Sequence, residues 1–261
     1  MSKYGYKYGL NLEARPLGSR DMSFFMTTAP ADSPNTYDKT NGVNGFQMLG
    51  NGPDPTLTVN GGNPVGDCGF VMTVNCEYVD SCETDEPFTM PTSNVVVGGY
   101  LVYNHGQDIG VSNPQLFAYW RKVGLPWGSK LVGSGGVNYR DWDESWAYLY
   151  TFGSGALQVL VSEAMEEATQ NGQPWDYNGT AADDNILGGH DVCVFARQDA
   201  TTGVLATWGM RQLFTQNWWT HQVQGLDVLL TDKQVARNGN GYGVDIAKLE
   251  QYTNALDKAA A

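Results

Sequence analysis

The sequence predicts a single α+β domain in which helices come first and a β-sheet follows. Apolar residues recur at helical spacing in the first part of the folded region, beginning with the segment after Cys68. Beyond Asp191 the pattern changes to short apolar runs separated by polar turns, which is typical of strands. The 261 residues are 41% apolar and 12% aromatic, which is enough to fill one core.

The chain divides into an extended irregular arm, residues 1–66, and a folded domain, residues 67–261. The arm is rich in Gly, Pro, Asn and Asp and shows little periodicity, apart from a short strand expected near residues 45–49. An arm of this length must lie against a folded body to be ordered, so we expect it to dock on the domain or on a neighbouring molecule.

Capping residues and apolar spacing place the helices. One begins at Cys68, and another starts with Asn113 as its cap and Pro114 in its first turn. The acidic run at residues 141–144 caps a further helix, which is a commoner role for such residues than a sugar site. The remaining helices are expected over residues 94–103 and 215–223 and after Asp245, and the strands over 156–162, 191–197, 203–208 and 227–230. Residues 133–136, Gly-Ser-Gly-Gly, are expected to form a flexible turn, because they lack the lysine of a phosphate-binding loop.

Charge and composition exclude several classes of partner. The formal net charge is −13 without any Lys/Arg-rich run, so the protein repels phosphate, and neither nucleic acid nor an anionic membrane is expected as a partner. The N-terminal stretch lacks the apolar core of a signal peptide, and no 18 apolar residues follow one another. The eight Trp and fourteen Tyr exceed the needs of a core, so we expect some of them on the surface as protein contacts.

The cysteines predict neither a disulfide scaffold nor a metal site. Four of them, Cys68, Cys76, Cys82 and Cys193, are too few and too scattered, and the sequence has no CxxC pair and no HExxH motif. We therefore predict no cofactor, no metal and a reducing compartment, although Cys76 and Cys82 could bridge outside a cell.

Cys68 and His190 have the surroundings of a nucleophile and its base. Glycines flank both of them, in Gly66-Asp67-Cys68-Gly69 and Gly188-Gly189-His190. A thiol becomes a strong nucleophile only as thiolate, which a helix N-terminus and a neighbouring imidazole both favour. The alternative is structural, with Cys68 as a small buried side chain and His190 as a satisfied strand residue.

These motifs, followed by Ala206-Thr207-Trp208-Gly209, resemble papain-like cysteine peptidases. The resemblance implies that Cys68 is the nucleophile and His190 the base. This sequence departs from the family pattern at two positions. Ala206 stands where the family has the Asn that orients the imidazole, and Gly62 stands where the family has the Gln that donates to the oxyanion. Asn63 could donate instead. Thr207, Asp191 or Asp67 could hold the ring, although Asp191 follows His190 directly on a strand and should point to the opposite face.

A narrower resemblance is to papain-like proteins of tailed phages and prophages of actinobacteria. Its further motifs are Leu49-Gly50-Asn51, Trp120-Arg121-Lys122-Val123-Gly124 and Trp218-Trp219. It implies a virion-associated protein, a capsid or tail component or a decoration, with a degenerate Cys-His site. Its partners would be other virion proteins or further copies of the chain, and it would be made in the host cytoplasm without a signal peptide. The alternatives are an active cysteine peptidase or amidase, with phage proteins or peptidoglycan stem peptides as substrate, and a carbohydrate-binding module.

Overall fold

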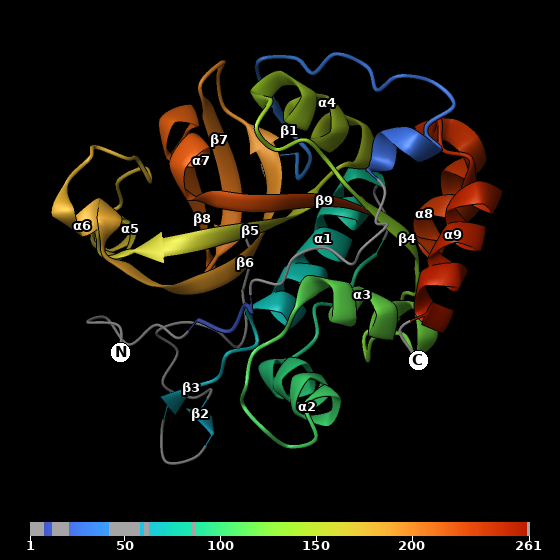
Figure 1. Cartoon of the computed structure of the whole chain (residues 1–261), viewed down its shortest axis with the longest axis horizontal. Coiled ribbons are helices and arrows are strands. Elements are labelled where there is room, and N and C mark those ends of the chain that lie inside the picture. Colours follow the sequence, from blue (N-terminus) through green and yellow to red (C-terminus); the bar gives the residue numbers. More distant parts are fainter. Residues whose placement is uncertain (1–7, 12–20, 42–57, 60–62, 85–86, 260–261) are drawn as a thin grey trace.

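A seven-stranded antiparallel sheet forms the centre of the computed structural model, which describes residues 8–11, 21–41, 58–59, 63–84 and 87–259. The strand order is β4-β9-β5-β6-β7-β8, and β1 pairs with β6 (Figure 1). The strands are β1 (Tyr37–Asp38), β4 (Leu131–Gly136), β5 (Gly155–Ser162), β6 (Ile186–Arg197), β7 (Thr202–Thr207), β8 (Met210–Thr215) and β9 (Val223–Thr231), with β2 (Thr58–Val59) and β3 (Asn63–Pro64) as a separate pair.

Helices lie on both sides of this sheet and at its ends (Figure 1). They are α1 (Cys68–Thr84), α2 (Ser93–Tyr103), α3 (Asn113–Lys122), α4 (Trp142–Phe152), α5 (Glu163–Gln170), α6 (Ala181–Asp184), α7 (Gln216–Gln222), α8 (Asp232–Asn238) and α9 (Ile246–Ala259), with 3₁₀ turns η1 (Met22–Phe25) and η2 (Gly239–Tyr242). The α+β prediction is thus confirmed. None of the helices in the described ranges is long and apolar enough to cross a membrane.

Alternation along the strands divides the core into two halves. On β6, Val192 and Val194 pack into an aromatic half with α4 and α7, whereas Cys193 and Phe195 pack against α1, α2 and α3. Because successive strand residues point to opposite faces, His190 belongs to the first half and Asp191 to the second. The prediction that Asp191 points to the face of the strand opposite to His190 follows from this arrangement.

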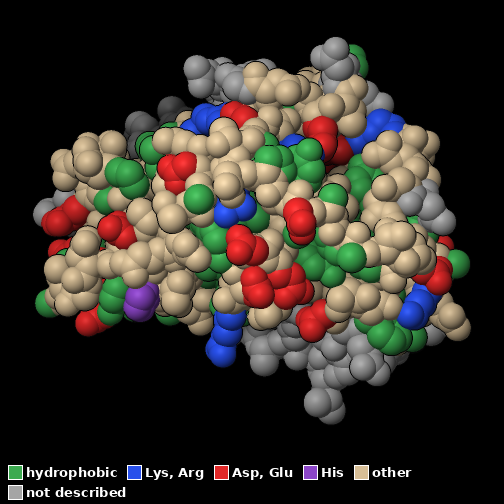
Figure 2. All heavy atoms as spheres, turned by 90° about the horizontal axis from the view of Figure 1, so that it is seen from above, with side chains coloured by type: hydrophobic (Ala, Val, Ile, Leu, Met, Phe, Trp, Pro, Cys, Tyr) green, Lys and Arg blue, Asp and Glu red, His purple; other side chains and the backbone are tan. Residues whose placement is uncertain are grey.

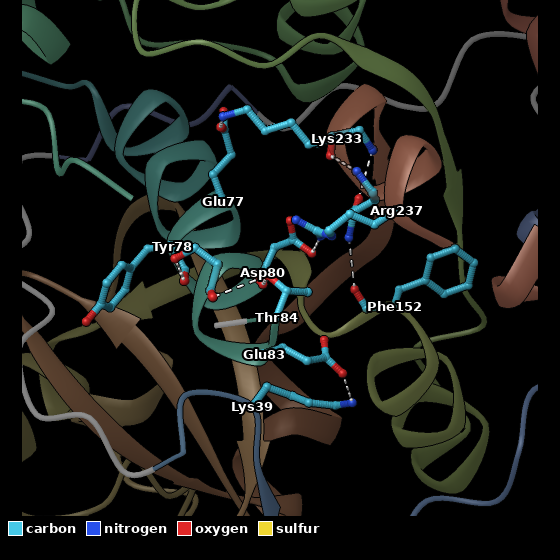
Figure 3. Close-up of polar contacts among 12 residues, drawn as sticks. Lys39, Glu77, Tyr78, Asp80, Glu83, Thr84, Phe152, Lys233 and Arg237 are labelled. Carbon is cyan, nitrogen blue, oxygen red and sulfur yellow. Dashed lines mark hydrogen bonds and ion pairs between the residues drawn. The ribbon is translucent and has the colours of Figure 1, made fainter. Parts of the chain in front are cut away.

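Ion pairs fix the end of the central helix α1 to elements far away in sequence. The carboxylates of Glu77, Asp80 and Glu83 pair with Lys233, Arg237 and Lys39, respectively (Figure 3). Acidic side chains at a helix C-terminus oppose the helix dipole, so these cations offset an unfavourable charge while they hold α8 and the β1 segment in place.

The expected helices form, and two local predictions are wrong. Ser112, not Asn113, is the residue before the third helix. The supposed flexible turn at residues 133–136 is part of β4 and pairs with β9. Glycine is needed there because a β-carbon on Gly133 would lie 2.6 Å from Leu249, since α9 packs directly on the strand.

The tryptophans fill the core and do not form a docking surface. Seven of the eight, all except the half-buried Trp127, are at most 8% exposed. Trp142, Trp146 and Trp219 contact one another and Phe214 in the aromatic half. The prediction of surface aromatics is therefore wrong for Trp, because α4 and α7 cover this face of the sheet with indoles.

The surface agrees with the negative net charge. Figure 2 shows Asp and Glu side chains spread across one face, with Lys and Arg at a few separate points. A face of this kind offers phosphate no continuous basic strip. The strand expected at 45–49 and the motif Leu49-Gly50-Asn51 lie outside the described residues. The boundary between arm and domain stays a prediction.

Candidate active site

His190 is held near the start of β6 by one hydrogen bond and two aromatic rings. Its Nε2 lies 2.8 Å from the Oγ1 of Thr207, and its ring stacks on Trp208 at a centroid distance of 5.1 Å. Tyr8 meets the ring edge-on. The second nitrogen, Nδ1, is buried without a hydrogen-bond partner. If Nε2–H donates to Thr207, Nδ1 is the unprotonated nitrogen that a general base requires.

Trp208 reaches His190 through a strained turn. Trp208 and Gly209 have φ values of 46° and 81° and connect β7 to β8, where Thr207 pairs with Met210. A two-residue hairpin turn with both φ values positive matches the twist of the strands, but a bulky residue rarely adopts this conformation. Contacts with His190 and Trp175 hold the indole in place.

Thr207 is the residue that contacts the ring, and Ala206 is not. Ala206 packs in the α1 half of the core, whereas Thr207 bonds to His190 in the aromatic half. Of the three residues considered as ring holders, Asp191 and Asp67 have no contact with the two ring nitrogens. Burial instead raises the pKa of both carboxyls well above its usual range.

Cys68 is the first residue of α1 and lies buried beside β6. Its side chain is 1% exposed. Burial, and after it the nearby Asp191 carboxyl, raises the pKa of its thiol to about 12. Backbone N–H groups of Asp191 and Gly9 point toward the sulfur and lower the pKa in part.

The pair is uncharged in this conformation. Burial lowers the pKa of His190 to about 3, so at neutral pH the imidazole is neutral and the Cys68 thiol keeps its proton. Because Nδ1 has no partner, the sulfur and the ring are not hydrogen-bonded to each other. The site therefore holds a protonated thiol and a neutral imidazole, without the thiolate that attack requires.

Residues 8–11, which we call the covering segment, lie across this pair. The N–H of Leu10 donates to the carbonyl of Gly189, and the N–H of Asn11 to that of Val111. The N–H of Val111 returns a bond to the carbonyl of Gly9 at 2.6 Å. The segment thus bridges the loop before α3 and the residue that precedes His190. Tyr8 contacts the His190 ring, and the backbone of Gly9 faces the Cys68 sulfur.

Glycines allow the covering segment to come this close. A β-carbon on Gly9 would overlap the carbonyl of Gly66, and one on Gly110 would overlap the carbonyl of Gly9. A β-carbon on Gly188 would lie 2.7 Å from the β-carbon of Tyr8. We call the backbone at Gly66, Gly110–Val111 and Gly188–Gly189 the glycine seat.

Comparison with solved structures identifies the architecture. The crystal structure of xylellain, a cysteine protease from Xylella fastidiosa, matches with a TM-score of 0.64, covering 86% of this chain and 96% of xylellain. The chain has a papain-like fold. Sequence identity over the match is 12%, so the likeness is one of fold. No family model and no curated protein matches the sequence.

The other expected site residues have separate outcomes. Asn63 lies in β3 opposite Val59, but its side chain is outside the described part of this papain-like chain. All four cysteines are free thiols, and Cys193 lies against Cys76. No group of three His, Cys, Asp or Glu side chains within the described ranges could hold a metal ion.

Proposed function

We propose that the protein is a cysteine peptidase of papain-like fold whose Cys68 and His190 are kept inactive by its own residues 8–11. The carrying observation is the bond between His190 Nε2 and Thr207. With Nε2–H as its donor, Nδ1 is left as the base on a ring that is fixed from both sides. Catalysis needs that tautomer and orientation, whereas a purely structural histidine would pair both of its nitrogens.

In the proposed reaction, the sulfur of Cys68 attacks the carbonyl carbon of a peptide bond while Nδ1 of His190 takes the thiol proton. That proton passes to the leaving amine, the C–N bond breaks, and a thioester remains on Cys68. Water then attacks the thioester, releases the carboxylic acid and restores the thiol. Unpaired N–H groups in the first turn of α1 would stabilise the oxyanion, with Asn63 as a possible second donor. Thr207 would act as a positioning residue.

The covering segment accounts for the inactive protonation state. Burial is the largest cause of both pKa shifts, the rise for Cys68 and the fall for His190. Removal of residues 8–11 would readmit water, so both pKa values would return toward their ordinary range and an ion pair could form.

The test is a full-length release variant that carries Gly5→Ala and Gly9→Ala. The β-carbon at position 9 would overlap Gly66 and expel the segment. Both glycines are changed because the triplet Lys-Tyr-Gly occurs twice, at residues 3–5 and 7–9, and the first copy could replace the second. Gly98→Ala is the matched control, because Gly98 lies in α2 with no atom within 4 Å of an added β-carbon.

We expect the release variant to cleave a mixed fluorogenic peptide library at least about tenfold faster than wild type, and Cys68→Ser in the same background to abolish cleavage. Gly98→Ala should behave like wild type. If the release variant reacts at Cys68 with a thiol-directed electrophile yet cleaves no peptide, the catalytic proposal is wrong.

A second candidate is a catalytically inert virion component of a tailed phage, with other virion proteins or further copies of this chain as partners. The observation in its favour is the burial of both Cys68 and His190 beneath the covering segment. It predicts stoichiometric amounts of the protein in purified particles. Trace amounts by mass spectrometry, together with cleavage by the release variant, would eliminate it.

A further inference from the structure

We propose that the glycine seat is a peptide-binding site selective for the sequence Tyr-Gly-Leu, occupied here by Tyr8, Gly9 and Leu10. The inference deepens the proposed function, on which its identification of substrates rests. The substrates or competing ligands would be peptides in which tyrosine precedes a glycine that lies over Cys68.

The glycine requirement comes from backbone contacts on two sides. The α-carbon of Gly9 faces the backbone of Gly66, and a β-carbon there would overlap the carbonyl oxygen and carbon of that residue. Gly110, on the other side, has a φ of 77° and would itself meet Gly9 if it carried a side chain. A backbone atom cannot move aside as a flexible side chain can, so any residue other than glycine is excluded at this position.

Supporting hydrogen bonds make this part of the seat rigid. The carboxylate of Asp108 accepts from the N–H of Gly66 at 2.9 Å and from the hydroxyl of Tyr100 at 2.7 Å. The Tyr100 hydroxyl in turn accepts from the N–H of Gly110 at 2.8 Å. One carboxylate and one phenol therefore hold the two glycines that enclose Gly9, and the gap between them is fixed before a peptide arrives.

The tyrosine requirement comes from a buried carboxylate. The hydroxyl of Tyr8 donates to Oε1 of Glu166, whose residue on α5 is fully buried. The same ring packs against Gly188 and meets His190 edge-on. A hydrogen bond to a buried carboxyl group discriminates against a side chain that lacks the hydroxyl, because the carboxyl oxygen would lose its partner, so phenylalanine should be a poor substitute.

Backbone pairing supplies the part of the affinity that does not depend on sequence. Leu10 pairs with Gly189 on one side, while Gly9 and Asn11 pair with Val111 on the other. Leu10 is itself 7% exposed, so a buried apolar residue follows the glycine. An extended peptide held on both sides in this way uses the mode of strand addition, in which adjacent side chains set the specificity.

The experiment measures binding without turnover. Full-length release variant with Cys68→Ser is titrated against a fluorescein-labelled blocked pentapeptide, Lys-Tyr-Gly-Leu-Asn, by fluorescence anisotropy. Two matched peptides replace its glycine by alanine or its tyrosine by phenylalanine. We expect saturable binding of the first peptide, about hundredfold weaker binding of the alanine peptide and about tenfold weaker binding of the phenylalanine peptide. Wild type should bind at least about tenfold more weakly than the release variant, because its own segment competes.

The inference would be overturned if the affinities of the glycine-containing peptide and its alanine analogue differed by less than about threefold. It would also be overturned if binding of the glycine-containing peptide did not saturate. If the release variant does not unfold cooperatively, Tyr8→Ala with Cys68→Ser takes its place, because that change removes the anchor without adding an overlapping atom. Selective binding without any cleavage would refute the peptidase but keep the site. Cleavage without glycine selectivity would support the peptidase and refute the selective site.

Discussion

The lowered pKa of His190 makes a quantitative prediction for stability against pH. In the folded protein this imidazole stays neutral down to a pKa of about 3, because burial opposes its charged form. In the unfolded chain it takes up a proton below about pH 6.5. Protons therefore bind preferentially to the unfolded state between these values, so stability is complete above pH 6.5 and is lost as the pH falls toward 3.

The size of the effect follows from the same two values. Each pH unit between them corresponds to about 1.4 kcal/mol, so His190 alone should reduce the free energy of unfolding by about 3 kcal/mol at pH 4. The full loss, reached below pH 3, is about 5 kcal/mol. No discount for solvent screening applies, because the side chain is 2% exposed.

The assay compares wild type with His190→Gln by urea unfolding at several pH values from 7 to 4. The buried carboxyls of Asp67 and Asp191 have raised pKa values and act in the opposite direction, since their folded forms hold protons that the unfolded chain releases. They are present in both proteins, so the difference between the two curves isolates the histidine. Wild type should lose about 3 kcal/mol more than the variant. Parallel curves would show that His190 is charged or solvated in the folded state.

Three further predictions follow from single contacts. Thr207→Val in the release variant should lower kcat about tenfold to hundredfold with little change in KM, because the imidazole loses its positioning bond; an unchanged kcat would contradict that role. Arg237→Ala should destabilise the protein by about 1–3 kcal/mol in urea unfolding, because the buried Asp80 loses this cation. Adding Asp80→Asn should recover part of the loss. Gly203→Ala should lower the free energy of unfolding by about 1–3 kcal/mol, because its β-carbon would lie 2.7 Å from Trp146. The control Gly98→Ala should leave it unchanged or raise it. Equal losses in the two variants would refute the packing argument.

Local signals predicted the helices of ten or more residues and four strands of the main sheet. The helix over α3 could be located because Pro114 and the apolar stripe agree, and α4 because Asp141 accepts a hydrogen bond from the N–H of Glu144 as a cap should. Strand β4 could not be predicted, because Leu-Val-Gly-Ser-Gly-Gly has turn composition. Its glycines are required by α9 and η1, which lie far away in sequence, so the reason for them exists only in the folded protein.

The candidate residues could be singled out from the sequence, but their surroundings could not. Cys68 and His190 have glycine neighbours that any single-sequence inspection detects. The family pattern placed the orienting residue at Ala206, one position away from Thr207, and on a strand a shift of one residue changes the face. The covering segment could not be predicted, because its contacts with Gly66, Val111 and Gly189 depend on pairings over long sequence distances.

Two features of the candidate site carry an energetic cost that bears on the proposed peptidase. A buried Nδ1 without a partner costs about 1–3 kcal/mol relative to a satisfied group, and Trp208 adds strain at a φ of 46°. Leucine at position 190 and glycine at position 208 would avoid both costs within the same papain-like fold. An inert scaffold gains nothing from an unpartnered imidazole nitrogen, whereas the proposed peptidase needs one as its base. If His190→Leu is more stable than wild type at pH 7 while cleavage by the release variant disappears, the cost is one that function explains.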